Sequence, residues 1–265
     1  MSAVVCVAVL AVASGLVDSR VESERAVERA RYAFTLGATQ PFENAFPRSV
    51  FERRVARELR EESLLAERFG MTVTRELLKE EYERIERSTR APEQWDAIKR
   101  ALGDDRLRVE DVFCRPLLVS RVLRARFAFD PQIHAEPHAQ AREARALFLA
   151  AKQPPEARRV RVRLADEAPP STDTLLAAAK AQAASGPRLL TPASPPPADT
   201  PETVSPEVAA VLQKQLRTPG DVTTILEERD QFEVFRLVAR AEDVLTAEVV
   251  RVPKRDFEAW FQANR

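Results

Sequence analysis

The chain has 265 residues, and its 41 Lys and Arg side chains balance 41 Asp and Glu side chains, so its formal net charge is zero. This balance argues against a general nucleic-acid-binding protein, while 45% hydrophobic and 31% charged residues are typical of a globular fold. With six glycines, two cysteines, two histidines and no glycine-rich phosphate-binding motif, the composition also argues against nucleotide-dependent catalysis, zinc fingers and a disulfide-dense scaffold, so we expect no cofactor.

The first 17 residues form an apolar segment. Ser2 to Val17 carries no charged side chain, and as a helix it would span about 24 Å, less than the roughly 30 Å of a bilayer core. Ala11-Val12-Ala13 has the small-x-small pattern of a signal-peptidase site, although no Lys or Arg precedes the apolar run. We therefore predict a signal peptide over residues 1–17 and a periplasmic or secreted protein. A short membrane anchor in the cell envelope and a buried segment are the alternatives.

Residues 18–152 have the pattern of a helical domain. Apolar residues recur at every third or fourth position from Ser49 to Phe69, and Gly70 follows as a typical helix-ending residue. Thr74 is a predicted N-cap for the next helix, and Pro92 suits the first turn of a third. We expect these apolar stripes to form the core of a helix bundle.

A long helical segment is predicted over residues 107–129. Pro116 should kink it, because proline lacks the main-chain N–H that an inner helical turn requires. The apolar residues of this segment fall on more than one side, so that one side can pack in the core while another binds a client or partner. An Ala-rich helix from Ala139 to Lys152 is expected to complete the helical domain.

The pattern changes after residue 152. Arg159 to Leu164 alternates basic and apolar residues, as in a half-exposed strand whose arginines face solvent. A helix is predicted from Thr174 to Ala184. The proline-rich residues 187–206 predict a loop or polyproline II spacer, and Ser205-Pro206 begins a further helix through Leu216.

The rest of the chain completes a small mixed domain. The predicted elements are a strand pair, a further strand and a terminal helix, at Val222–Leu226, Phe232–Val238, Ala247–Val252 and Asp256–Gln262. We therefore predict an α+β fold with a helical domain at 18–152, a small α+β domain at 153–253 and a C-terminal helix at 254–265.

Several segments of the helical half follow a known order of a helix, a capped second helix, a short helix and a long return helix. They are Val50-Phe51-Glu52, Phe69-Gly70-Met71-Thr72-Val73-Thr74, Leu77-Leu78-Lys79, Ala101-Leu102-Gly103 and Pro116-Leu117-Leu118-Val119. In this order the helical half resembles the N-terminal module of SurA-type periplasmic chaperones and the related PpiC-like foldases. The resemblance implies an ATP-independent chaperone that holds unfolded or exported polypeptides on apolar surfaces, with peripheral membrane association as a further option.

The second half resembles a reduced parvulin, the peptidyl-prolyl isomerase domain that follows in such proteins. The matching segments are Ala157-Arg158-Arg159-Val160, Val204-Ser205-Pro206-Glu207-Val208, Pro219-Gly220-Asp221-Val222 and Phe232-Glu233-Val234-Phe235. The resemblance implies that Arg159 and Glu233 replace the two His of the family's strands. It also implies that Val204 and Val208 replace the Met and Phe that line its proline pocket.

These departures predict loss of the isomerase activity. The barrier of about 18–20 kcal/mol comes from amide resonance, so a catalyst must bind the twisted peptide bond better than the planar one. Such binding needs a shaped apolar pocket and oriented polar groups, and we expect no catalytic residue here. The candidate peptide-binding residues are Val204, Val208, Phe232 and Phe235. A further useful observation is whether Arg159 and Glu233 face one another across a concave sheet. The alternatives are an active parvulin-type isomerase and a structural subunit of an envelope complex.

Other titratable residues give no site. His134 and His138 are four apart, but Pro137 lies between them and no third ligand is evident, so we expect exposed loop histidines and no metal. The pairs Glu61-Glu62 and Glu80-Glu81 are expected on solvated helix faces. After signal cleavage Cys114 would be the one remaining cysteine, which predicts no internal disulfide.

Overall fold

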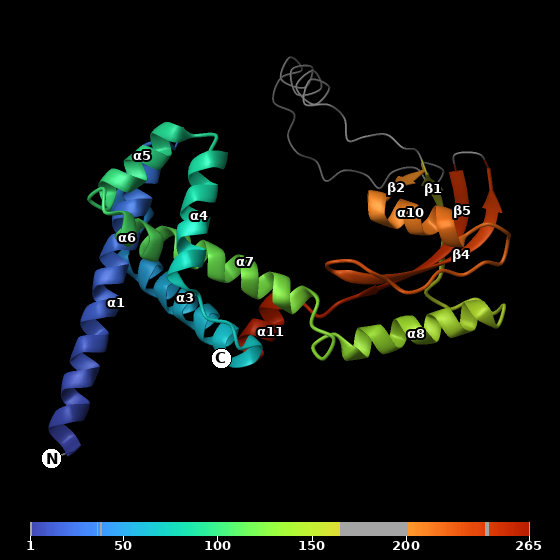
Figure 1. Cartoon of the computed structure of the whole chain (residues 1–265), viewed down its shortest axis with the longest axis horizontal. Coiled ribbons are helices and arrows are strands. Elements are labelled where there is room, and N and C mark those ends of the chain that lie inside the picture. The colour runs from blue at the N-terminus through green and yellow to red at the C-terminus, as the bar shows by residue number, and fades with distance from the viewer. Residues whose placement is uncertain (1, 36, 38, 165–200, 242–243, 265) are drawn as a thin grey trace. The chain divides into compact units, whose positions relative to one another are not determined.

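The computed structural model describes residues 2–35, 37, 39–164, 201–241 and 244–264 (Figure 1). The chain divides into two compact units: a helical unit, Met1–Phe129 together with Asp256–Arg265, and a sheet unit, Asp130–Arg255. It is a mixed helix and sheet protein, consistent with the predicted α+β class. The predicted helix at 174–184 and most of the proline-rich stretch lie outside the described residues.

The helical unit is built from helices that the local sequence signals delimit well. Its elements are α1 (Ser2–Tyr32), α2 (Phe42–Ala45), α3 (Arg48–Phe69), α4 (Arg75–Ser88), α5 (Pro92–Ala101), α6 (Arg106–Val109), the π-helical turn η1 (Glu110–Cys114), α7 (Arg115–Ala128) and α11 (Phe257–Ala263). Gly70 ends α3 in the left-handed region, with φ of 63°. The Thr74 hydroxyl accepts the Leu77 N–H at 3.4 Å and so caps α4 as predicted.

α1 is one continuous helix across the predicted end of the signal peptide at residue 17. Its N-terminal part projects beyond the other helices of the unit (Figure 1). From Val21 onward it packs against α3, α5 and η1. Among the described helices, none combines the length and the apolar character needed to cross a bilayer.

The long predicted helix 107–129 begins one residue earlier and consists of three consecutive helical segments. α6 leads into the π-helical turn η1, and α7 follows. Pro116 lies in the first turn of α7 and has no N–H to donate to the carbonyl four residues before it. The disruption expected at Pro116 therefore takes the form of a wider turn immediately before the proline.

The core of the helical unit is aromatic at both ends. One cluster joins α1, α4, α5, α6 and η1, and it contains Val27, Tyr82, Trp95, Ile98, Leu102, Val109, Val112 and Cys114. At the other end α11 packs on α3 and α7, where the Trp260 ring lies 5.1 Å from the Phe127 ring and 6.3 Å from the Phe69 ring. The C-terminal helix is thus part of the helical unit rather than a separate element.

The sheet unit contains a curled five-stranded sheet between two helices. Its elements are α8 (Ala135–Leu149), β1 (Arg158–Arg163), β2 (Glu202–Thr203), α10 (Pro206–Gln215), β3 (Leu226–Glu227), β4 (Gln231–Arg240) and β5 (Val244–Pro253). The strand order is β2-β1-β5-β4-β3. β2 runs parallel to β1, and the other neighbouring strands are antiparallel.

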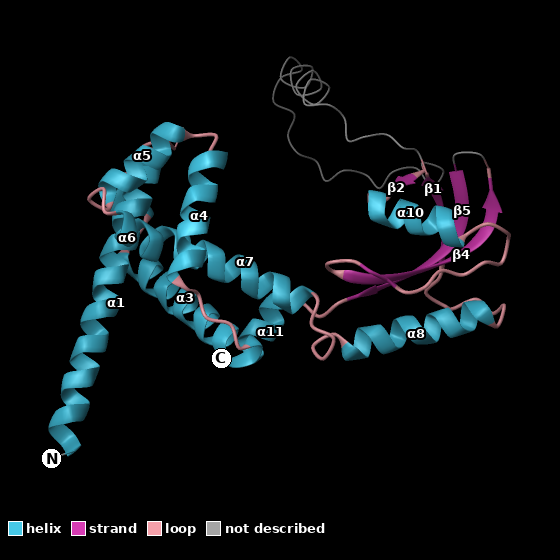
Figure 2. Cartoon of the chain, viewed as in Figure 1, coloured by secondary structure: helices cyan, strands magenta, loops and turns pink. Residues whose placement is uncertain are grey.

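The two helices cover opposite faces of the sheet (Figure 2). Because successive strand residues point to opposite faces, Phe235 and Leu237 pack on α10 while Phe232 and Val234 pack on α8. The strands buried on both faces are β4 and β5, which explains their nearly continuous apolar sequences.

Three sequence expectations differ from this architecture. The Ala-rich helix α8 packs on β4 and β5, so the boundary between the units lies at 129/130 and not at 152. The predicted strand Val222–Leu226 is reduced to a single bridge between Val222 and Arg236 and the two residues of β3. Within the proline-rich stretch, Glu202 and Thr203 form β2 because they pair with the side of β1 that faces away from β5.

Candidate functional site

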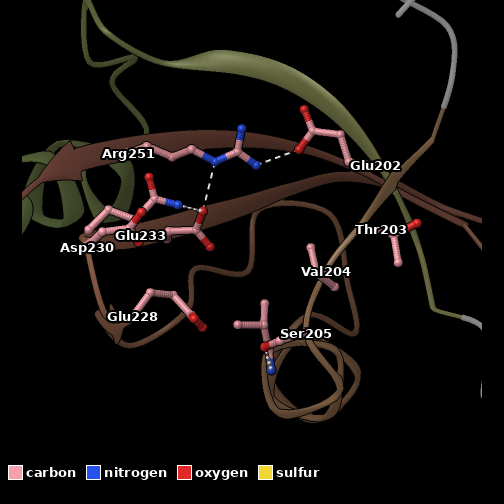
Figure 3. Close-up of a pocket in the computed structure, with 10 residues that line it drawn as sticks. Glu202, Thr203, Val204, Ser205, Glu228, Asp230, Glu233 and Arg251 are labelled. Atoms are coloured by element: carbon pink, nitrogen blue, oxygen red, sulfur yellow. Dashed lines mark hydrogen bonds and ion pairs between the residues drawn. The ribbon is translucent and has the colours of Figure 1, made fainter. Parts of the chain in front are cut away.

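A recess on the α10 face of the sheet unit contains the first candidate site. It has a volume of about 370 Å³ and lies where β2 leads into α10 and where the β3–β4 turn approaches β5 (Figure 3). Its lining residues are Glu202, Thr203, Val204, Ser205, Val208, Glu228, Asp230, Gln231, Glu233 and Arg251. The Ser205 hydroxyl is occupied, because it accepts the Val208 N–H at 3.3 Å as the N-cap of α10.

Arg251 is the cation of this recess and is held on two sides (Figure 3). Its Nη2 donates to Glu202 Oε2 at 2.5 Å and its Nε to Glu233 Oε1 at 2.8 Å. Burial lowers the pKa of Arg251, but the hydrogen bonds that it donates to Glu202 and Glu233 outweigh this effect and raise that pKa above its ordinary value. Gln231 Nε2 also donates to Glu233 Oε1 at 2.8 Å, so the buried Glu233 carboxylate is well satisfied.

The recess has an excess of negative charge. Glu228 and Asp230 add two carboxylates to those of Glu202 and Glu233, against the single guanidinium of Arg251. Burial, followed by the nearby charges of Glu233, Glu207 and Asp230, raises the pKa of Glu228. The recess is suited to a cationic group and not to the apolar ring of a proline.

The structure brings together three of the residues expected from sequence. Val204, Val208 and Glu233 all line the recess, where the parvulin resemblance implied a peptide-binding pocket. Val208 is nevertheless buried in the core beneath α10, so little of its surface is available.

The other three expected residues lie elsewhere. Phe235 is fully buried under α10, and Phe232 is buried on the opposite face, where its ring meets the His138 ring at 5.3 Å. The candidate peptide-binding roles of these two phenylalanines are therefore wrong, because both are core residues.

Arg159 does not face Glu233 across the sheet. Arg159 lies opposite Glu248 on β5, and Glu248 lies opposite Arg236 on β4. The Arg236 guanidinium covers the Phe148 ring of α8 at 4.9 Å, which assigns this row of side chains to the α8 face. Glu233 belongs to the α10 face, and β5 separates the strands of Arg159 and Glu233.

Apart from Glu233, sequence reasoning missed the charged residues of the recess. Glu202 was assigned to a loop because β2 has two residues and no recognisable alternation. Arg251 was expected only as one position of a strand, Ala247–Val252. The signal that could have identified the site is the match in charge between Glu233 and Arg251, which face each other across β4 and β5.

The second candidate site is a partly uncovered side of the segment α6–η1–α7. Val109, Val112 and Leu123 are buried in the helical unit. On the same segment Leu107 is 59% exposed and Leu117 is 47% exposed. The segment thus carries apolar side chains on more than one side, as predicted, and some of them remain in solvent.

A buried pair of carboxylates lies between α1 and α3 in the helical unit. The Glu58 side chain is 13% exposed, and Arg20 Nη2 lies 3.4 Å from its Oε2. Burial, followed by the charge of Glu24, raises the pKa of Glu58 to about 7. The pKa of Glu24 is raised as well, first by burial, although Arg54 and Arg20 oppose the increase. Nothing in the sequence distinguished these two residues from the exposed glutamates around them.

Several other titratable residues are more buried than expected. His134 is fully buried at the start of α8, where its Nδ1 accepts the Arg255 N–H at 3.3 Å, so the prediction of exposed loop histidines is wrong. Pro137 is accommodated in the first turn of α8, where its missing N–H costs nothing. Burial raises the pKa of the Cys114 thiol to about 12, which makes it inert.

The acidic pairs are only partly solvated. Glu61 is buried beside Arg57, whose Nε donates to it at 3.0 Å. Glu81 is buried between Arg84 and Arg121, with hydrogen bonds of 2.7 and 2.6 Å. Burial raises the pKa of Glu81, but these hydrogen bonds outweigh it and hold the pKa below its ordinary value. Arg57 and Arg84 lie one helical turn from Glu61 and Glu81, so local ion pairs allow both carboxylates to be buried. Arg121, 40 residues along the chain, adds a partner for Glu81 that sequence spacing did not reveal.

Within the described part of the chain, no group of three or more His, Cys, Asp and Glu side chains is arranged to hold a metal ion. In comparisons with known proteins, no family model, curated protein or solved structure matches this chain.

Proposed function

We propose that this protein is an exported, ATP-independent chaperone that binds unfolded polypeptides through apolar surfaces and has no isomerase activity. The observation that carries the proposal is the exposure of Leu107 and Leu117 on a helical segment whose opposite side is buried in the core. Apolar groups that remain in solvent after the core is complete gain free energy by covering the apolar groups of another chain.

This mode of binding fits a client that has no defined structure. Leucine contacts are not directional, so they accept many sequences. Burying the exposed part of one leucine contributes about 1 kcal/mol, which gives weak, reversible contacts that release the client when it folds. The SurA-type resemblance of the helical half points to the same class of activity.

The recess on the α10 face supports the absence of isomerase activity. Its lining is mostly polar and its oriented groups, Arg251 and Glu233, are already bonded to each other. Phe232 and Phe235, the two phenylalanines expected to contact a proline ring, are buried in the core. A proline-containing tetrapeptide should therefore exchange between cis and trans at the uncatalysed rate in the presence of the chain.

The chaperone activity is tested with a urea-unfolded outer-membrane protein diluted into buffer, with light scattering as the readout. The full chain should suppress scattering. The double variant Leu107→Ser/Leu117→Ser should bind the client roughly thirtyfold more weakly, because it loses about 1 kcal/mol at each position and so about 2 kcal/mol in total.

Leu149→Ser is the matched control, since Leu149 is 59% exposed on α8 in the sheet unit. It should suppress scattering as the unaltered chain does. No suppression by the unaltered chain at molar excess, or equal suppression by the double variant, would refute the proposal.

A further inference from the structure

β5 extends beyond the strand that covers one of its edges. β1 pairs with β5 from Arg163 opposite Val244 to Arg158 opposite Val249. β4 pairs with β5 as far as Pro253. Residues 250–253, here called the open edge, therefore have a strand neighbour on the β4 side but none on the other side among the described residues. Before β1 the chain forms a turn instead, closed by the Ala157 N–H and the Pro154 carbonyl at 3.1 Å.

The alternation of the ladder determines which main-chain groups the open edge presents. Lys254 N–H donates to the Asp230 carbonyl at 2.8 Å, so the even-numbered residues at this end of β5 bond to β4. The N–H and carbonyl of Arg251 and the carbonyl of Pro253 consequently point to the open side. No main-chain hydrogen bond joins Arg251 to the described turn 154–157. Since Pro253 has no N–H, an added strand meets one donor and two acceptors in a single register.

A groove of about 300 Å³ lies beside the open edge on the α8 face. α8 contributes Ala144 and Leu147 to an apolar floor that the valines of the open edge continue. Glu143 and Glu156 are exposed at the groove and supply two carboxylates. The one cation among the lining residues, Arg251, directs its guanidinium to the recess on the other face.

We propose that the open edge and this groove form a strand-addition site for a basic, extended polypeptide segment with small apolar side chains. The site rests on the proposed function and names one class of segment that the chain recognises. The segment pairs with Arg251 through its main chain and inserts small apolar side chains beside Ala144 and Leu147. Its Lys or Arg side chains meet Glu143 and Glu156, and charge complementarity therefore selects a basic partner.

The probe is a fluorescein-labelled octapeptide of alternating Lys and Val, and binding to the full chain is measured by fluorescence anisotropy. Arg251→Pro removes the outward N–H of the open edge, whereas Arg251→Ala removes the same ion pairs and keeps that N–H. Arg251→Pro should bind the probe about tenfold more weakly than Arg251→Ala, as expected for one lost main-chain hydrogen bond. A probe with N-methylated main-chain nitrogens should bind the unaltered chain weakly as well.

A second variant tests the charges without altering the sheet. Glu143→Gln/Glu156→Gln should weaken probe binding about tenfold at low salt and less at high salt, whereas Glu207→Gln, on the exposed side of α10, should not. Unchanged binding by this double variant, equal binding by the two Arg251 variants, or equal binding of the N-methylated probe would overturn the site. If the chain still suppresses client aggregation in that case, the proposed function stands without this site; if it binds neither client nor probe, both fail.

Discussion

Replacing Glu58 by glutamine should stabilise the helical unit at alkaline pH. The Glu58 carboxylate is 13% exposed between α1 and α3 and lies near the second buried carboxylate of Glu24. In the folded chain its pKa is raised from 4.5 to about 7. Below the unfolded value of 4.5 the group is protonated in both states and costs nothing. The cost of ionising it in the folded state grows as the pH rises above 4.5 and is complete above about 7.

The size of the effect follows from the same two values. The interval from 4.5 to about 7 corresponds to about 3 kcal/mol of unfolding free energy at 1.36 kcal/mol per pH unit. Glutamine is neutral and can still accept the Arg20 hydrogen bond, so Glu58→Gln should recover up to this amount at pH 8. At pH 4.5 the variant and the unaltered chain should differ by less than about 0.5 kcal/mol.

Urea unfolding followed by tryptophan fluorescence measures the unfolding free energy of the helical unit, because both tryptophans, Trp95 and Trp260, lie in that unit. Glu52→Gln is the control, since Glu52 lies on the same helix and is half exposed beside Arg48. It should change the unfolding free energy by less than about 0.5 kcal/mol at either pH. The reasoning would be refuted if Glu58→Gln were less stable than the unaltered chain at pH 8, or if its gain in unfolding free energy were the same at pH 4.5. Either result would show that burial does not raise the pKa of Glu58 to about 7.

Three further predictions concern burial and capping. In a Cys6→Ser background, Cys114 should resist a thiol reagent at pH 8 until urea unfolds the helical unit; rapid labelling of the folded chain would contradict its buried position and its pKa of about 12. Phe261→Ala should lower the unfolding free energy of the helical unit by about 3 kcal/mol, because the ring is almost fully buried between α11 and α3, and a loss below 1 kcal/mol would refute that packing. Ser205→Ala should cost about 1 kcal/mol and speed amide hydrogen exchange at Val208, whereas unchanged exchange would mean that the hydroxyl does not cap α10.

The sequence predicted features that depend on neighbouring residues. Gly70 and Thr74 delimit two helices through their own backbone geometry and hydroxyl, so a few residues suffice to recognise them. The N-cap at Ser205 and the alternation of β1 were predicted for the same reason. Such signals do not require knowledge of what lies across the fold.

Features that depend on distant residues were missed. α8 was assigned to the helical domain because its apolar stripe does not tell which unit it faces, and the structure buries that stripe on β4 and β5. The two residues of β2 form a strand only because β1 supplies the partner. Glu81 was expected in solvent, since the arginine at position 121 that pairs with it lies far along the chain. The site residues Phe232 and Phe235 were misassigned in the same way, because alternation along β4 puts them in two different cores.

The return of α11 to the helical unit has a consequence for how the chain acquires its structure during synthesis. Residues 256–265 are made only after the whole sheet unit, yet Phe127 and Phe69 need Trp260 to cover their rings. Because the sheet unit is continuous in sequence, it can fold before the helical unit is complete, since the helices made earlier still lack α11. A fragment ending at residue 129 would keep exposed rings on α3 and α7 and should aggregate, so biochemical dissection of this protein requires the tail to be retained or grafted back through a short linker.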